Sequence, residues 1–244
     1  TWWLLAFAFM VLVTVVLSNL APVLILPLFF KTEPLADKEL RERLLGLAER
    51  SHIKIRNVFQ IRLSSKTTAG NAMLMGWGNT RRIVIGDTML QRYSPEEIEV
   101  VMAHELGHHR HGDIFRQIVV QSALMLLGFY LMNLTLNWAV PRLDMSGISD
   151  VAALPLLALV GAAFALVLMP LSNAYSRHLE ESADRYSLAA TENPDAFAAM
   201  LTKLTDQNLS ESEPSRWSEL LFYDHPPYSK RVELANRYRK EGKR

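Results

Sequence analysis

The residues best suited to chemistry in this sequence of 244 residues form one short pattern, His104 to His108, which reads HELGH. Two histidines four residues apart lie on one face of an α-helix, so both imidazoles can bind the same metal ion. Glu105 lies beside them, where a carboxylate can act as a general base. The pattern therefore predicts a catalytic zinc site carried by a helix.

The residues before this pattern predict how that helix begins. Ser94 is a suitable N-cap, Pro95 suits the first helical position, and Glu97 completes a capping box. Apolar residues then follow at helical spacing in the segment 98–102. An exposed helix rich in His and Glu would not need this apolar face, so we expect the helix to be buried.

Two histidines do not complete a catalytic zinc site, which takes three protein ligands and a water molecule. His111 follows His104 by seven residues, and a straight helix would carry it almost two turns away from the metal. His109 points to another helix face, and His52 lies at the end of a charged segment. We expect His52, His109 and His111 to be structural or solvated.

A better source of the third ligand is the segment Ser176–Asp184, which reads SRHLEESAD. Glu180 and Asp184 are four residues apart, so both carboxylates share one face of a helix. One of them can bind zinc while the other accepts a hydrogen bond from a ligand imidazole and fixes its tautomer. Spacing alone leaves Glu181 as good a candidate as Glu180.

The composition limits the remaining possibilities. The chain is 50% hydrophobic, has a formal net charge of +1 and contains no cysteine. Disulfides and thiolate ligands are therefore excluded, so a zinc ion must be held by histidine and carboxylate. A net charge near zero gives no basis for binding nucleic acid.

Three long stretches have no charged residue: 2–30, 117–140 and 151–174. At a rise of about 1.5 Å per residue, each can cross a hydrocarbon core of roughly 30 Å. Since such runs are rare in soluble folds, we interpret them as transmembrane helices in a lipid bilayer. The first run lacks the basic start of a signal peptide. Because the chain starts at Thr1 and is already apolar there, we expect a C-terminal fragment of a longer chain.

The charges predict the topology. The loop 141–150 is short, so the second and third runs form a hairpin that returns the chain to the side it left. Most Lys and Arg residues lie outside the hairpin, and the positive-inside rule places them in the cytoplasm. The predicted organisation is a transmembrane helix at 1–30, the first part of a catalytic domain at 31–116, a transmembrane hairpin at 117–175 and the second part of that domain at 176–244.

The polar regions combine helices with a few short strands. An amphipathic pattern predicts a helix within 34–51, whereas alternation at 58–63 predicts a strand. Short strands are expected at 71–75 and 82–85, around a turn at 76–79. Further helices are predicted at 179–190, 194–205 and 228–244. The expected fold is mainly α, with a small β-sheet.

Three motifs together resemble a known family: HELGH at 104–108, RHLEESAD at 177–184 and DHPP at 224–227. They are similar to those of the membrane zinc metalloproteases of the type I CAAX prenyl endopeptidase family, which belongs to the HtpX-like clan. The segments 24–34, 65–76 and 82–89 also resemble this family. The resemblance implies an integral-membrane fold in which transmembrane helices accompany a gluzincin-type α+β zinc protease domain. Further membrane helices are expected before the present segment.

The resemblance also implies roles for individual residues. His104, His108 and Glu180, rather than Glu181, match the ligands of one zinc ion per chain. Glu105 matches the catalytic base, and His225 matches a histidine facing the scissile carbonyl. The other matched residues are supporting acids at Asp184 and Asp113, and substrate-binding positions at Asn71, Ala72 and Arg231.

The function implied is a zinc-dependent endopeptidase that acts on peptides or proteins, with its catalytic part facing the cytoplasm. Prenylated CAAX peptides are the substrate that the resemblance favours, and membrane-embedded proteins are a second possibility. The alternatives are a general quality-control protease of membrane proteins, like HtpX, and a proteolytically silent membrane scaffold. A transporter is disfavoured because the three apolar runs contain no charged residue.

Overall fold

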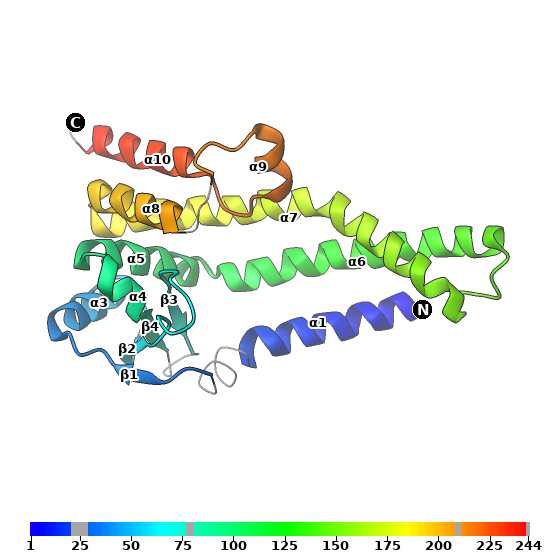
Figure 1. The fold of residues 1–244 in the computed structure, drawn as a ribbon, viewed down its shortest axis with the longest axis horizontal. Coiled ribbons are helices and arrows are strands. Elements are labelled where there is room, and N and C mark those ends of the chain that lie inside the picture. Colours follow the sequence, from blue (N-terminus) through cyan, green and yellow to red (C-terminus); the bar gives the residue numbers. More distant parts are fainter. Residues whose placement is uncertain (21–28, 77–80, 208–210, 243–244) are drawn as a thin grey trace.

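The computed structural model describes residues 1–20, 29–76, 81–207 and 211–242. It has two parts, a head that combines helices with a small sheet and a rod of three long helices (Figure 1). The chain is mainly α-helical, and the predicted fold class is confirmed. The expected turn at 76–79 lies largely outside the described residues.

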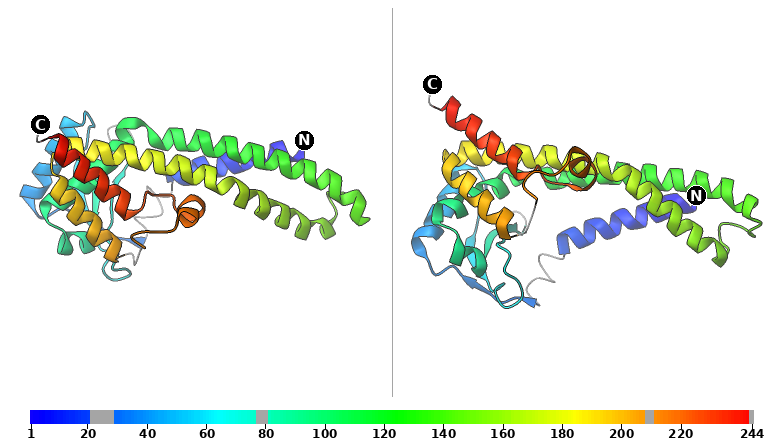
Figure 2. Two further views of the ribbon diagram at one scale, coloured as in Figure 1. Left: turned by 90° about the horizontal axis from the view of Figure 1, so that it is seen from above. Right: turned by 45° about the horizontal axis from the view of Figure 1, so that its top comes forward.

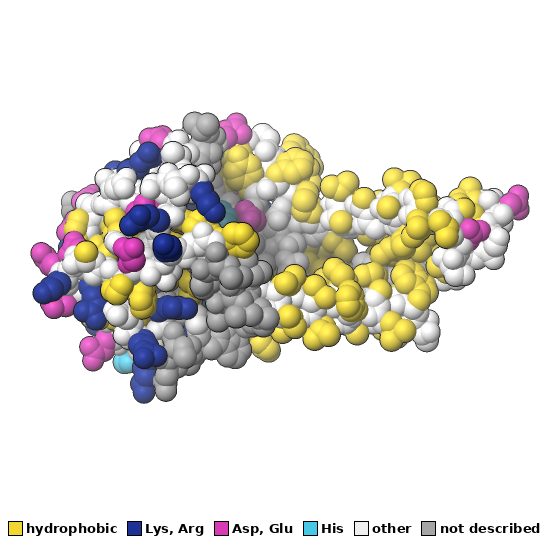
Figure 3. All heavy atoms as spheres, turned by 60° about the horizontal axis from the view of Figure 1, so that its bottom comes forward, with side chains coloured by type: hydrophobic (Ala, Val, Ile, Leu, Met, Phe, Trp, Pro, Cys, Tyr) yellow, Lys and Arg dark blue, Asp and Glu magenta, His cyan; other side chains and the backbone are white. Residues whose placement is uncertain are grey.

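The rod consists of α1, α6 and α7, and α7 continues from the rod into the head (Figures 1 and 2). The stretches Asp113–Leu143 and Val151–Thr191 are long and apolar enough to cross a membrane, and Trp2–Ser18 is a shorter apolar helix. Many large apolar side chains of the rod are exposed, as Figure 3 shows. Such a continuous apolar surface is typical of contact with lipid. The helices are α1 (Trp2–Leu20), α6 (Asp113–Ala139) and α7 (Leu154–Thr191), with 3-10 turns at Val140–Leu143 and Val151–Ala153 between the last two.

The sequence predicted a helix at 179–190 that is separate from the preceding apolar run, and the separation was wrong. The helix α7 runs without a break from Leu154 to Thr191, and Pro170 lies inside it. The apolar run and the carboxylate motif are therefore parts of one continuous helix. The position of Glu180 is consequently tied to the position of the membrane-spanning part of α7.

The sheet has four strands in the order β1-β2-β4-β3. The central strands β2 and β4 are parallel, with Val58 opposite Ile83, and both outer strands are antiparallel to their neighbours. Three strands confirm the sequence prediction. The three-residue strand β1 was not expected, because it has no alternating apolar pattern. The bounds are β1 (Thr32–Pro34), β2 (Asn57–Ile61), β3 (Ala72–Met75) and β4 (Arg82–Gly86).

One face of the sheet and the surrounding helices form the main core of the head. Ile83 and Ile85 of the sheet are fully buried in the same cluster as Leu44, Met102 and Leu106. The helices α8 and α10 pack on the side of α5 and α7 that faces away from the sheet (Figure 1). The helices of the head are α3 (Lys38–Arg50), α4 (Asp87–Arg92), α5 (Pro95–His111), α8 (Pro194–Gln207), α9 (Arg216–Phe222) and α10 (Tyr228–Glu241).

The helix α5 begins as the sequence predicted. Glu97 N donates to Ser94 Oγ at 3.3 Å, and Ser94 N donates to the Glu97 carboxylate at 2.7 Å, which completes the capping box. The helix ends at His111. Gly112 then adopts a left-handed conformation with φ of 69°, which glycine allows at little cost, and α6 starts at the next residue.

Candidate metal centre

The three predicted metal ligands lie together. His104 and His108 are one turn apart on α5, and Glu180 reaches them from α7. The two Nε2 atoms are 3.1 Å apart, and oxygens of Glu180 lie 3.2 Å from His104 Nε2 and 3.3 Å from His108 Nε2. Ligand atoms bonded to zinc at about 2.0–2.1 Å in tetrahedral geometry are about 3.3–3.4 Å from one another. The observed spacing is therefore close to that of a tetrahedral zinc site.

Gly107 allows this close approach of the two helices. A Cβ atom added at this position would lie 3.2 Å from Tyr186 Cβ and 3.3 Å from Ala183 Cα, both on α7. Side chains rarely tolerate such short distances, and a backbone atom cannot move aside easily. The glycine inside the HELGH pattern thus lets α7 pack near enough for Glu180 to reach the histidines.

An aspartate holds each ligand imidazole through its Nδ1 atom. His104 Nδ1 lies 2.9 Å from Asp184 Oδ1, and His108 Nδ1 lies 3.0 Å from Asp113 Oδ2. A carboxylate can only accept, so both Nδ1 atoms donate, and in the neutral rings both Nε2 atoms carry a free lone pair. This is how metal-binding histidines are usually oriented.

The donor set fits a divalent cation. Two Nε2 lone pairs and the Glu180 carboxylate face one another, and Glu180 Oε2 is buried without a hydrogen bond among the described residues. Burial lowers the pKa of His104, but its hydrogen bond with Asp184 and the neighbouring Glu180 carboxylate outweigh burial and raise this pKa to about 10. The centre thus favours positive charge, which zinc would supply. Two histidines and a glutamate also form a known set of catalytic zinc ligands.

Two arginines bind the supporting aspartates. Arg231 of α10 donates from Nε and Nη2 to the Asp184 carboxylate at 2.7 and 2.6 Å, and its side chain is only 14% exposed. Arg116 of α6 donates to Asp113 at 3.1 Å. The sequence resemblance assigned Arg231 to substrate binding. In the structure Arg231 lines the cavity beside the site and also holds Asp184, which the sequence did not predict.

Glu105 is on α5 between the two histidines and lines the same cavity as His104 and Glu180. Burial raises the pKa of its carboxyl group, although His104 and His108 oppose this effect. A carboxyl group whose pKa is raised toward neutrality is suited to accept and return a proton. The geometry is therefore compatible with the predicted role of Glu105 as general base.

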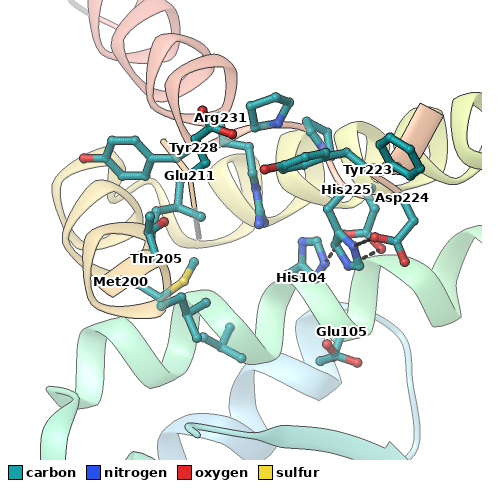
Figure 4. Close-up of a pocket in the computed structure, with 17 residues that line it drawn as sticks. His104, Glu105, Met200, Thr205, Glu211, Tyr223, Asp224, His225, Tyr228 and Arg231 are labelled. Atoms are coloured by element: carbon teal, nitrogen blue, oxygen red, sulfur yellow. Dashed lines mark hydrogen bonds and ion pairs between the residues drawn. The ribbon is translucent and has the colours of Figure 1, made fainter. Parts of the chain in front are cut away.

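A cavity of ≈ 780 Å³ lies next to the ligands, between α5, α8 and the segment 222–228. Glu105 of α5 and His225 both line this cavity, and Figure 4 shows His225 beside His104. The apolar residues of α8 were not identified from the sequence as part of the site. The apolar helical pattern at 194–205 was the feature that could have indicated them. Apolar side chains that line the cavity are Val101, Met200, Leu201, Leu204 and Phe222.

His225 lies near the ligands on the loop before α10. Its Nε2 atom is 3.4 Å from Glu180 Oε1, and its Nδ1 atom is 2.8 Å from Asp224 Oδ1. The side chain is 55% exposed, so its position depends on the loop rather than on a packed core. Pro226 and Pro227 follow it and stiffen that loop. The sequence did not single out Asp224 as the hydrogen-bond partner of His225.

The predicted substrate-binding residues Asn71 and Ala72 are at the start of the edge strand β3. Asn71 is exposed, and its backbone oxygen accepts a hydrogen bond from Gly86 N at 2.8 Å. Ala72 is 7% exposed and belongs to the core, so only its backbone is available to a ligand. Within the described residues β3 pairs with β4 alone, which leaves its other edge for an added strand.

The remaining candidates lie elsewhere. Glu181, which spacing alone could not separate from Glu180, forms an exposed ion pair with Arg185 at 2.6 Å. His111 Nδ1 lies 3.2 Å from Ser182 Oγ, and the His111 ring packs edge-on against Tyr186. Neither residue belongs to the cluster of potential ligands.

Comparison with known proteins identifies the family. Residues 34–239 match the model of peptidase family M48, and the chain therefore belongs to this family. The metal-ligand cluster at His104, His108 and Glu180 is compatible with the metal that a metalloprotease of this family requires.

Several individual proteins are similar to the chain. An uncharacterized metalloprotease of Bacillus subtilis, YhfN, is 32% identical over 240 residues, which are 97% of this chain and 56% of that protein. A CAAX prenyl protease 1 homolog of Oryza sativa is 32% identical over 228 residues, which are 92% of this chain and 53% of that protein. The chain thus spans about half the length of these relatives.

A solved structure shares the fold. The crystal structure of Ste24p from S. mikatae matches with a TM-score of 0.83 at 24% sequence identity. The match covers 97% of this chain and 59% of the Ste24p chain. This similarity shows a shared fold, and two helices of the chain are long and apolar enough to cross a membrane.

Proposed function

We propose that the chain is the catalytic part of an integral-membrane zinc endopeptidase. The observation that carries the proposal is the cluster of His104, His108 and Glu180 with Glu105 beside it in one cavity. His104, His108 and Glu180 would hold one zinc ion per chain. When bound, zinc supplies a Lewis acid that polarises a carbonyl group and makes a water molecule more acidic.

Glu105 then does the proton chemistry. It accepts a proton from the attacking water and later passes that proton to the leaving amine. Asp184 and Asp113 keep the ligand imidazoles in the tautomer that presents Nε2 to the metal. Because both aspartates are themselves bound by arginines, the imidazoles need little reorientation during the reaction.

His225 would stabilise the negative charge that develops on the carbonyl oxygen. Its Nε2 atom lies near the ligands, and the Asp224 carboxylate takes the hydrogen on Nδ1. With Nδ1 held by Asp224, the Nε2 atom is the one that can face the developing oxyanion. Asn71 and the free edge of β3 would hold the substrate as an added strand.

The substrate class that we favour is prenylated C-terminal CAAX peptides. Support comes from relatives named CAAX prenyl protease 1 homologs and from the apolar side chains that line part of the cavity, which suit a lipid chain. Mass spectrometry of products from a farnesylated CAAX peptide and from an unmodified membrane protein separates this substrate from general quality control. Cleavage of the unmodified protein alone would contradict the prenylated substrate while leaving the endopeptidase in place.

We also propose that the catalytic head faces the cytoplasm, because the basic residues lie on that side of the hairpin. Ser65 of the head and Ser146 of the hairpin loop are both exposed. Cysteines introduced at these positions in the otherwise cysteine-free chain should react from opposite sides of a sealed membrane. Labelling of Ser65→Cys from outside the cell, or of both positions from one side, would contradict this topology.

The chemistry is tested most simply by Glu105→Gln. The variant should keep its zinc and fold but lose turnover of the peptide by about three orders of magnitude, the scale expected for removal of an essential base. Glu181→Gln is the matched control, because Glu181 is exposed and forms an ion pair with Arg185 outside the ligand cluster. Near-normal turnover of Glu105→Gln would contradict the mechanism.

A further inference from the structure

The short helix α9 presents large apolar side chains to solvent at the junction between the head and the rod. Trp217 is 73% exposed, Phe222 is 67% exposed and Leu220 is 41% exposed. A contiguous group of exposed aromatic and aliphatic side chains often marks a surface that contacts a membrane or another protein. The function proposed above uses Phe222 only as a residue that lines the cavity, and it assigns no role to Trp217 or Leu220.

Side chains of α7 fix the position of α9. Arg177 donates to the backbone oxygens of Glu219 and Tyr223, and Asn173 donates to the backbone oxygen of Leu221 at 2.7 Å. The bonds to Leu221 and Tyr223 satisfy carbonyl groups at the C-terminal end of α9, and the Glu219 oxygen also accepts from Tyr223 N. Since α9 has only seven residues, its place depends on this attachment to α7.

The attachment lies where the apolar part of α7 ends. Leu171 is 58% exposed, and Arg177 is the first charged residue of α7 after its apolar run. They are six positions apart in the helix, which corresponds to about 9 Å along the axis. The helix α9 therefore lies at the level where a spanning helix passes from hydrocarbon to water. Tryptophan is typical of such a boundary, and Trp, Phe and Leu are typical of the apolar face of an interfacial helix.

We propose that α9 is an interfacial helix that inserts Trp217, Leu220 and Phe222 into the lipid headgroup region on the cytoplasmic side. The apolar surface of the rod, at Leu166 and Leu171 of α7, continues this surface into the bilayer. Figures 1 and 2 show α9 alongside α7 at the end of the rod that joins the head. Lipid is the occupant that this continuity favours over a second protein.

The polar side of α9 is consistent with this placement. Glu219 faces α10, where its carboxylate accepts from Lys230 at 2.5 and 2.8 Å, and its side chain is 17% exposed. Glu219 is thus paired with the head, whereas Arg216, the other charged residue of α9, is exposed beside Trp217. Phe222 and Tyr223 also line the cavity, so the insertion would hold the cavity mouth at the bilayer surface.

Spin labels on single cysteines test this proposal. Trp217→Cys, Leu220→Cys and two reference variants would be labelled in nanodiscs that contain one copy of the chain. Leu166→Cys reports the bilayer interior, since Leu166 is 62% exposed on the apolar part of α7. Ser65→Cys reports water, since Ser65 is exposed on the head. Collision rates with oxygen and with a water-soluble nickel chelate then give the depth of each label.

The ratio of the oxygen collision rate to the nickel collision rate should be several-fold higher for labels at positions 217 and 220 than for the label at position 65. It should be lower than the ratio for the label at position 166. A value equal to that at position 65 would overturn the proposal. Shielding from both reagents would also overturn it, because protein rather than lipid would then cover α9. Each variant should have the same circular dichroism spectrum as the parent chain, so a misfolded variant is recognised. The measurement needs no peptidase activity, so it succeeds or fails independently of the proposed function.

Discussion

His104 and His108 both donate from Nδ1 to an aspartate, but the two aspartates are held in different ways. Asp184 is 1% exposed and receives two hydrogen bonds from the nearly buried Arg231. Asp113 is also buried, but it receives one hydrogen bond from Arg116, whose side chain is 43% exposed.

The metal centre thus has two halves, one formed by His104, Asp184 and Arg231 and the other by His108, Asp113 and Arg116. They also differ in which parts of the chain they connect. Asp184 is 80 residues from His104 and 47 residues from Arg231, so this half joins α5, α7 and α10. Asp113 is five residues from His108 and three from Arg116, so the other half is formed by the local turn at Gly112. The first half therefore couples the metal centre to the tertiary fold, whereas the second orients one ligand.

The largest effect is expected for Asp184→Ala. This change leaves the buried guanidinium of Arg231 without its partner and removes the acceptor of His104. Loss of one member of a buried ion pair costs about 3–5 kcal/mol of the free energy of unfolding. Chemical denaturation of the protein in detergent measures this loss. Asp113→Ala is the matched variant, and a larger loss there would reverse the comparison.

Arg231→Lys should have the next largest effect. Lysine keeps the charge but cannot make two hydrogen bonds to Asp184 in a fixed plane. Loss of one charged hydrogen bond costs about 1.5–3 kcal/mol of the free energy of unfolding. The same denaturation experiment measures it, with Arg116→Lys as the control that should change little. Equal losses of stability in the two variants would mean that the two hydrogen bonds from Arg231 to Asp184 contribute no more than the single bond from Arg116 to Asp113.

Asp113→Asn should weaken metal binding while leaving the fold intact. Removal of a hydrogen-bond partner of a ligand histidine typically lowers metal affinity about 10–100-fold. Competition for zinc against a chelator of known affinity measures this change, and circular dichroism checks the fold. An unchanged zinc affinity would show that the Gly112 turn alone orients His108.

Arg116→Ala should have the smallest effect. The ion pair with Asp113 is partly exposed, and such pairs contribute about 0–1 kcal/mol to stability. Zinc affinity should stay within a few-fold of the parent chain. A loss as large as that of Asp113→Asn would show that Arg116 positions the carboxylate and is more than a surface partner.

Local features of the sequence were enough to predict α5. The Ser94 and Glu97 capping box and the i, i+4 histidines act within a few residues, and the structure contains both as expected. The strand β2 was predicted for the same reason, since alternating apolar residues are a local pattern, and β3 and β4 were predicted as short strands around a turn.

Features that depend on tertiary packing were not predicted. The choice between Glu180 and Glu181 depends on how α7 is rotated against α5, and spacing along one helix does not contain that angle. The resemblance to a known family, not the pattern, favoured Glu180. Likewise, the bond from Arg231 to Asp184 joins two helices that are distant in sequence. The strand β1 exists only because β2 provides a partner.

The central claim is that one metal ion is bound by His104, His108 and Glu180. Zinc content per chain after dialysis, measured for Glu180→Ala and Glu181→Ala, tests it most directly. The parent chain and Glu181→Ala should each retain one zinc ion per chain, because Glu181 pairs with Arg185 outside the cluster. Glu180→Ala should lose most of its zinc while keeping its helical content. Full zinc in Glu180→Ala together with loss of zinc in Glu181→Ala would contradict the account.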